Sequence, residues 1–204
     1  MNKKEYFLRV FKAAEKKYGK YDKRLAGDDW KHDWQTLIAT IMSAQTRDEV
    51  TIPVAEKLFA RYSTVEKLSG AKVRDVLGII RSVNFSKTKA RNVVASARYL
   101  VEHYNGKVPD SIDELIKMPG VGRKTANLVL SEVHEKDGIT VDTHVHRLAN
   151  VFGFVRTRNP TETEFELMKI APKKYWSRIN RILVLWGKDV RGRDKKILLG
   201  KLKE

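Results

Sequence analysis

A proline and glycine turn between two helical patterns is the feature that most constrains this chain. The run Met118-Pro119-Gly120-Val121-Gly122 separates two apolar patterns of helical spacing. Proline ends the first helix, and each glycine is free to adopt a positive φ, so the chain can reverse in a tight hairpin. The hairpin presents backbone N–H groups at the start of the helix near Arg123, where the helix dipole also favours an anion. The pattern predicts a phosphate-binding turn, with an ordinary interhelical turn as the alternative.

Charged residues close to this turn favour the phosphate-binding interpretation. Arg123 and Lys124 follow the glycines directly, and Asp142 lies downstream in Val141-Asp142-Thr143-His144. A lone lysine or aspartate is most often a solvated surface charge. An amine and a carboxylate that accompany an anion-binding turn instead indicate a functional site.

The overall charge of the chain points to a polyanionic partner. Its 204 residues carry a formal net charge of +16, which disfavours a compact state unless a polyanion faces it. Nucleic acid is the leading partner. An acidic membrane is the competitor, but the sequence has no apolar run of about 18 residues and no signal-peptide or lipidation pattern. With no cysteine, disulfides and thiolate metal sites are excluded, and we expect a soluble intracellular protein.

Helical periodicity runs through most of the sequence. Apolar residues recur at helical spacing, for example over residues 5–18 and 88–103, and a period-2 run is confined to residues 138–141 at most. The pattern therefore predicts an all-α protein. A helix over residues 48–62 is expected to hold Pro53 only in its first turn. Three Ser/Thr-x-x-Glu runs predict helix N-caps at Ser63, Ser111 and Thr161.

These motifs together resemble the helix-hairpin-helix DNA glycosylases of the endonuclease III family. The resemblance includes Ser43-Ala44-Gln45-Thr46 and Lys89-Ala90-Arg91-Asn92, and it covers roughly residues 30–190. It implies an all-α fold of two lobes with the active-site cleft between them. The implied organisation has an N-terminal helix in the terminal-helix lobe, a six-helix barrel lobe that includes the hairpin 118–122, and C-terminal helices with a basic tail that complete the first lobe. These three parts correspond to residues 1–29, 30–139 and 140–204.

The resemblance implies a covalent mechanism. The catalytic lysine of the family matches Lys124, which would attack the sugar C1′ of a flipped-out nucleotide, expel the base and form a Schiff base. That imine allows the strand to be cut by β-elimination. The catalytic aspartate matches Asp142, where a carboxylate can stabilise positive charge that develops on the sugar.

Further residues are implied to bind DNA. Gln45 matches a glutamine that enters the helix where the base has left, and Phe85 stands where the family usually has a leucine wedge. A side chain must fill that gap because flipping costs a few kcal/mol of stacking and pairing. The alternative for Phe85 is a core aromatic. The remaining candidates are Gly120, Val121, Gly122 and Arg123, in and directly after the hairpin, and His144 in the run that contains Asp142.

The chain departs from the family pattern at its C-terminal end. Most members carry four cysteines there that ligate a [4Fe–4S] cluster, whereas this chain has none. We therefore expect no metal and no iron–sulfur cluster, and a basic tail after Trp186 in its place.

The function predicted is that of a base excision repair DNA glycosylase with AP lyase activity, acting on damaged and specifically oxidised pyrimidines. Within the same fold, a thymine or uracil mismatch glycosylase and a purine-lesion glycosylase are alternatives. A non-catalytic helix-hairpin-helix DNA-binding protein is an alternative of another class. The expected partner is double-stranded DNA with damaged bases or AP sites, bound by a monomer in the cytoplasm at the nucleoid, or in the nucleus of a eukaryote.

Overall fold

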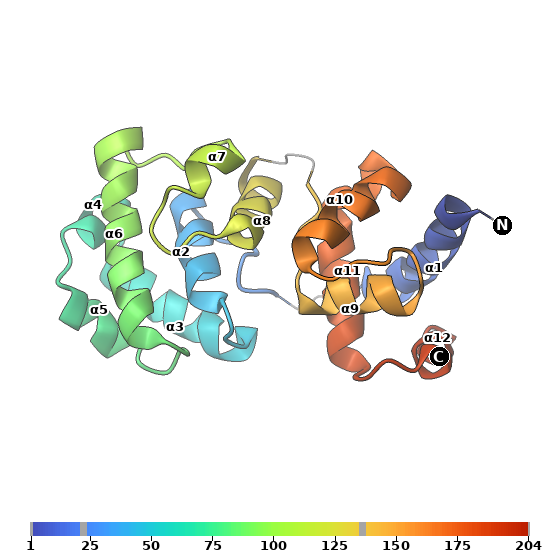
Figure 1. Ribbon diagram of the computed structural model, residues 1–204. Helices are drawn as coiled ribbons and strands as arrows, with labels where there is room; N and C mark the ends of the chain where they lie inside the picture. The colour runs from blue at the N-terminus through green and yellow to red at the C-terminus, as the bar shows by residue number, and fades with distance from the viewer. Residues whose placement is uncertain (1, 21–23, 135–137, 204) are drawn as a thin grey trace. The chain divides into compact units, whose positions relative to one another are not determined.

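The chain folds into helices joined by short loops (Figure 1). The computed structural model describes residues 2–20, 24–134 and 138–203, and these residues contain no β-strand. This confirms the predicted all-α class. None of the helices described is long and apolar enough to cross a lipid bilayer.

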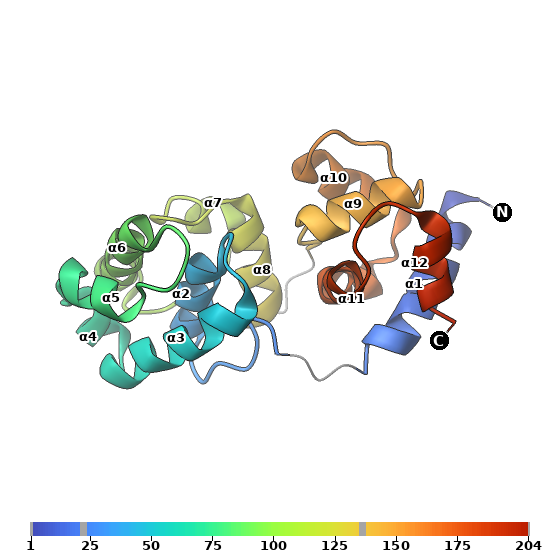
Figure 2. The ribbon, with the colours of Figure 1, turned by 90° about the horizontal axis from the view of Figure 1, so that it is seen from below.

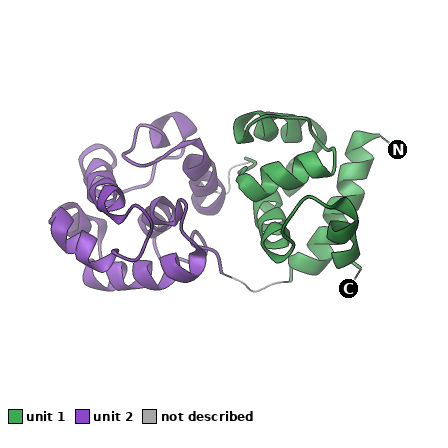
Figure 3. Cartoon of the chain, turned by 60° about the horizontal axis from the view of Figure 1, so that its bottom comes forward, with its two compact units in different colours: residues 1–22, 136–204 green, residues 23–135 purple. Residues whose placement is uncertain are grey.

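Two compact units divide the chain, and both ends of the sequence belong to the same one (Figure 3). Unit 1 combines residues 1–22 with residues 136–204, and unit 2 contains residues 23–135. The helices of unit 2 are α2 (Asp33–Ser43), α3 (Asp48–Arg61), α4 (Val65–Ser69), α5 (Val73–Ile79), α6 (Ser86–Tyr104), α7 (Ile112–Leu115) and α8 (Arg123–His134). Those of unit 1 are α1 (Lys3–Tyr18), α9 (Thr143–Val151), α10 (Pro160–Ile170), the 3₁₀-helix η1 (Lys173–Tyr175), α11 (Trp176–Asp189) and α12 (Lys195–Lys201).

Helix α2 is the centre of unit 2. It contacts α3, α6 and α8 (Figures 1 and 2). Its residues from Trp34 to Met42 are buried except Gln35, as expected for a helix that is apolar on nearly every side. Because nearly all of this stretch is packed in the core, the position of α2 is fixed. The position at which the following loop begins is therefore fixed too.

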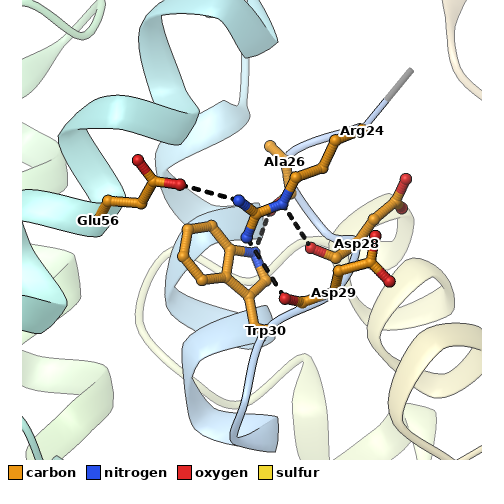
Figure 4. Close-up of polar contacts among 6 residues, drawn as sticks. All are labelled: Arg24, Ala26, Asp28, Asp29, Trp30 and Glu56. Atoms are coloured by element: carbon orange, nitrogen blue, oxygen red, sulfur yellow. Dashed lines mark hydrogen bonds and ion pairs between the residues drawn. The ribbon is translucent and has the colours of Figure 1, made fainter. Parts of the chain in front are cut away.

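Side-chain contacts fix the loop that precedes α2 in unit 2. Arg24 lies over the Trp30 ring at 4.2 Å from the ring centroid and pairs with Glu56 of α3 at 2.9 Å (Figure 4). The indole N–H of Trp30 donates to the carbonyl of Ala26, and the ring packs edge-on against Phe59. These contacts attach this polar loop to helix α3.

Aromatic side chains form the core of unit 1. Phe152 stacks on Trp186 of α11 with ring centroids 5.0 Å apart, and Tyr18 of α1 stacks on the same indole. The Tyr18 hydroxyl donates to Asp189 at 2.7 Å. Helix α1 therefore completes the core of the C-terminal helices although it lies at the other end of the sequence.

Several helix boundaries differ from the sequence expectation. Ser111 caps α7 as predicted, but Thr64 caps α4 in place of Ser63, and Asn159 caps α10 in place of Thr161. Asn159 is the N-cap of α10 because the next residue, Pro160, suits the first helical position. Pro53 lies in the interior of α3, beyond the first turn, where it has no N–H to donate to the carbonyl four residues earlier.

Pro53 is exposed to solvent, so replacing it tests the cost of this missing bond. We expect Pro53→Ala to raise the free energy of unfolding by about 1–3 kcal/mol, measured by calorimetry, because alanine restores a helical N–H without disturbing packing. The matched control is Pro160→Ala, which should change stability little because the first helical position needs no N–H. An unchanged or lower stability of Pro53→Ala would show that α3 has already adapted to its proline.

Candidate DNA-binding and catalytic site

The predicted hairpin joins α7 to α8. Gly120 has φ of +80°, whereas Gly122 does not adopt a positive φ. A Cβ on Gly120 would lie 2.7 Å from Nδ2 of Asn92, and for Gly122 no described atom lies within 4 Å of such a Cβ. Gly120 is therefore required by both backbone conformation and close packing, and Gly122 leaves open space in front of the turn.

Helix α6 holds the hairpin in place. The Ser96 hydroxyl donates to the carbonyl of Pro119 at 2.6 Å, and Asn92 lies against Gly120. Ser96 is fully buried, so this hydrogen bond is shielded from water. These two α6 residues fix the turn, and the sequence analysis gave neither of them this role.

The amides of the hairpin have different uses. The Val121 N–H donates to the carbonyl of Met118 at 3.1 Å, and the Val121 side chain is buried. Within α8 the first amide to reach a helical carbonyl is that of Ala126, which donates to Gly122. The amides of Gly122 and Arg123 precede this first helical hydrogen bond, at the N-terminus of α8. The Val121 side chain therefore packs inside the turn and is shielded from solvent.

Lys124 occupies the second position of α8, and its side chain is exposed, as is that of Arg123. The opposite face of α8, which includes Ala126 and Val129, is buried in the core of unit 2. The helix thus presents an amine directly behind a turn suited to a phosphate.

Asp142 is the N-cap of α9 in unit 1. Its Oδ1 accepts the amides of His144 at 2.8 Å and Val145 at 2.9 Å. Its Oδ2 has no hydrogen-bond partner among the residues that the structure describes. The cap fixes the carboxylate at the positive end of the helix dipole, and the second oxygen is left to interact with another charge.

His144 lies half-buried where α9 meets α11. A Cβ on Gly187 would be 2.7 Å from its Nδ1, so α11 needs a glycine at this crossing. Burial lowers the pKa of His144; Arg147 and Lys188 act in the same direction, while Asp142 and the Gly187 backbone oppose them. The lowered pKa favours the neutral imidazole, whose nitrogens can donate and accept hydrogen bonds.

Gln45 and Phe85 occupy two loops of unit 2 that lie side by side. Asn84, the residue before Phe85, donates its side-chain amide to the carbonyl of Gln45, and its backbone N–H donates to the Thr46 hydroxyl at 3.1 Å. Phe85 is 65% exposed, which excludes the alternative of a core aromatic. Both residues adopt a left-handed backbone, with φ of +55° for Gln45 and +58° for Phe85.

The C-terminal segment does not fit an iron–sulfur cluster. The chain has no cysteine, and the described residues contain no group of three His, Cys, Asp or Glu side chains that could hold a metal ion. Arg147 of α9 instead holds the segment after α11, with its guanidinium donating to the carbonyls of Gly187, Val190 and Gly192. The predicted basic tail forms α12, which Asp194 caps.

The chain is similar to known proteins in sequence and in fold. The model of the HhH-GPD superfamily of base excision DNA repair proteins matches residues 38–173. Endonuclease III of Thermotoga maritima is 45% identical over 157 residues, covering 77% of this chain and 74% of that protein. Endonuclease III of Bacillus subtilis is 35% identical over 156 residues, covering 76% and 71%. A solved structure described as a trapped endonuclease III–DNA covalent intermediate, in an estranged-adenine complex, superposes with a TM-score of 0.86 at 33% identity, covering 95% of this chain and 92% of that one.

The all-α fold with a hairpin before α8 is that of the helix-hairpin-helix class of DNA repair proteins. With the matches above, the chain belongs to the HhH-GPD superfamily of base excision DNA repair proteins and, within it, to the endonuclease III family of bifunctional DNA glycosylases and AP lyases. The likeness to a thermostable thymine-DNA glycosylase, with a TM-score of 0.79 at 16% identity, is one of fold alone.

The two hairpin glycines provide a matched pair of variants. We expect Gly120→Ala to lower the free energy of unfolding by about 1–3 kcal/mol, because alanine is strained at positive φ and meets Asn92. Gly122→Ala should keep the stability of the wild type, measured by chemical denaturation. Loss of DNA affinity in Gly122→Ala at unchanged stability would report a direct backbone contact with phosphate. Equal stability of the two variants would contradict this account of the turn.

Proposed function

We propose that this protein removes oxidised pyrimidines from double-stranded DNA with Lys124 as the nucleophile and Asp142 as the stabilising carboxylate. The observation that carries the proposal is the position of Lys124, exposed in the first turn of α8 directly behind the hairpin. The relative described as a trapped covalent intermediate with DNA supports a covalent route.

The proposed reaction begins when the Lys124 amine attacks C1′ of the flipped nucleotide. A bond forms between Nζ and C1′ as the glycosidic bond breaks, and the base leaves with the bonding electron pair and takes up a proton. The sugar ring then opens to an imine. Loss of a C2′ proton and cleavage of the C3′–O bond cut the strand, and hydrolysis releases the lysine.

Asp142 is suited to assist the first of these steps. Its Oδ1 is held by two α9 amides, which fixes the carboxylate in one orientation before the substrate arrives. A preorganised negative charge stabilises an oxocarbenium-like sugar more effectively than a mobile one.

The substrate class is the finer part of the proposal. The 45% identity to endonuclease III of Thermotoga maritima supports, for this chain, the oxidised pyrimidines that the sequence resemblance implies. A thymine mismatch or purine-lesion specificity has weaker support, because the thymine-DNA glycosylase and a 3-methyladenine DNA glycosylase are only 16% and 14% identical. A panel of duplexes with oxidised pyrimidines, mismatched thymine or uracil, and alkylated purines separates these specificities.

We further propose that the protein acts as an intracellular monomer on damaged DNA and needs no cofactor. Gln45 and Phe85 would enter the duplex at the extruded base, and the hairpin amides with Arg123 would hold the backbone. His144 would add a contact from unit 1.

The cofactor proposal has a direct test. Protein expressed with added iron and purified without oxygen should contain far less than one iron per chain and no absorption from sulfur-to-iron charge transfer, because thiolate ligands are absent. Iron analysis and a visible spectrum measure this, and a cysteine-bearing endonuclease III prepared in parallel is the control. Stoichiometric iron would contradict the proposal.

Two variants that each remove one charge test the catalytic roles. Lys124→Gln should abolish both borohydride trapping on damaged DNA and strand cleavage, while DNA binding survives because the hairpin is unchanged. Asp142→Asn keeps an N-cap acceptor for α9, so the fold should be retained. Its single-turnover base release should slow by about 100-fold or more, because the carboxylate is lost from the transition state.

Cleavage of a preformed AP site separates the two roles. Asp142→Asn should retain part of this activity, because no base has to leave. Full trapping by Lys124→Gln would move the nucleophile to another amine. Normal base release by Asp142→Asn would remove Asp142 from the mechanism.

A further inference from the structure

We propose that Lys89 is a positioning residue for base extrusion, which holds the Gln45 and Phe85 loops together in the conformation that enters DNA. This inference rests on the proposed DNA-inserting roles of Gln45 and Phe85. It adds a residue from the buried side of the site.

The Lys89 ammonium spans the end of α2. Nζ donates to the carbonyls of Met42 and Ala44, each at 2.6 Å, and to the Thr46 hydroxyl at 2.8 Å. An ammonium has three protons, so all its donors are used. The residues it binds surround Gln45 in the sequence, and this part of the backbone is fixed on both sides of the glutamine.

The same residue is also bonded to the second loop. Its backbone N–H donates to the carbonyl of Phe85 at 3.0 Å, which closes the first turn of α6. Asn84 adds two bonds from the Phe85 loop to Gln45 and Thr46. Lys89 therefore joins the two loops through its backbone on one side and its side chain on the other.

Burial of this cation is costly, and nothing in the described core neutralises it. The residue is only 5% exposed, and burial lowers its pKa to about 8. No carboxylate among the described residues pairs with it. Carbonyls at a helix C-terminus favour a cation, which offsets part of the cost. A methionine or leucine would fill this space without the free-energy cost of burying a charge. The ammonium is therefore explained best by the loop whose backbone it binds.

The loops need such a support because their backbones are unfavourable. Glutamine and phenylalanine rarely adopt positive φ, and each such residue costs about 1 kcal/mol or more. Gln45 and Phe85 both do so while their side chains remain exposed, so neither is held by burial in the core. The hydrogen bonds around Lys89 are the local contacts that maintain these conformations.

The test compares Lys89→Met with Lys87→Met, which removes an exposed lysine from the same helix. Two reactions are measured at a temperature where both variants are folded. One is single-turnover release of an oxidised pyrimidine from a duplex, and the other is cleavage of an AP site in a single strand, which requires no insertion into a helix. Lys89→Met should slow the duplex reaction by about 10- to 100-fold and leave single-strand cleavage within about twofold. Lys87→Met should change neither.

A double-mutant cycle shows whether Lys89 acts through the loops. In the Gln45→Ala, Phe85→Ala background, Lys89→Met should cause little further loss on the duplex, because the groups that it positions are already absent. Independent losses that multiply would overturn the proposal.

The absence of cysteine permits a chemical rescue. In Lys89→Cys, alkylation of the unfolded chain with 2-bromoethylamine followed by refolding creates a lysine analogue at this position alone. Duplex activity should return with this reagent and stay low with the uncharged 1-bromopropane. Recovery with both would assign Lys89 to simple space filling.

The remaining outcomes are distinct. Unchanged duplex excision by Lys89→Met, or equal loss on single-strand and duplex substrates, would overturn the role of Lys89 while the proposed function stands. A wild-type protein that releases no damaged base from any duplex would overturn the proposed function and this inference together.

Discussion

Three polar residues on one side of α6 support the part of unit 2 that is proposed to face DNA. Lys89, Asn92 and Ser96 follow one another at helical spacing, so they lie on the same side of the helix. Lys89 binds the end of α2, and Ser96 binds Pro119 of the hairpin, with Asn92 packed against Gly120. A single rigid helix thereby fixes both the loops that carry Gln45 and Phe85 and the turn that precedes Lys124. Buried hydrogen bonds from α6 therefore position the exposed residues Gln45, Phe85 and Lys124.

Helix N-termini are the second structural feature that positions functional side chains. Lys124 stands in the first turn of α8, and Asp142 caps α9, so both proposed catalytic groups are placed by the start of a helix. The two ends have different proposed roles, because the start of α8 is proposed to face phosphate whereas α9 uses its first amides to orient a carboxylate. In unit 1 the Arg147 guanidinium orders the chain after α11 with three backbone carbonyls. That contact holds the segment in which this chain lacks the four cysteines that the family pattern implies.

Sequence reasoning identified the all-α class, the family and the hairpin, because these depend on periodicity and on turn residues that act locally. It could not distinguish the two hairpin glycines, since the positive φ of Gly120 and its packing against Asn92 both depend on the folded structure. It also missed that Val121 is buried and that Asn159, directly before Pro160, is the N-cap of α10. The left-handed backbones of Gln45 and Phe85 run against their propensities and arise from tertiary contacts. One signal for Lys89 was present, a lysine on the apolar face of a helix beside Ala90 and Val93.

The most direct test of this account is a crystal structure of the borohydride-reduced adduct between this protein and a duplex that carries an oxidised pyrimidine. The account predicts a covalent bond from Lys124 Nζ to C1′, Asp142 beside the same sugar, and Gln45 and Phe85 within the duplex with the Lys89 hydrogen bonds intact. A bond from another amine to C1′, or a duplex that lies away from the Gln45 and Phe85 loops, would contradict it.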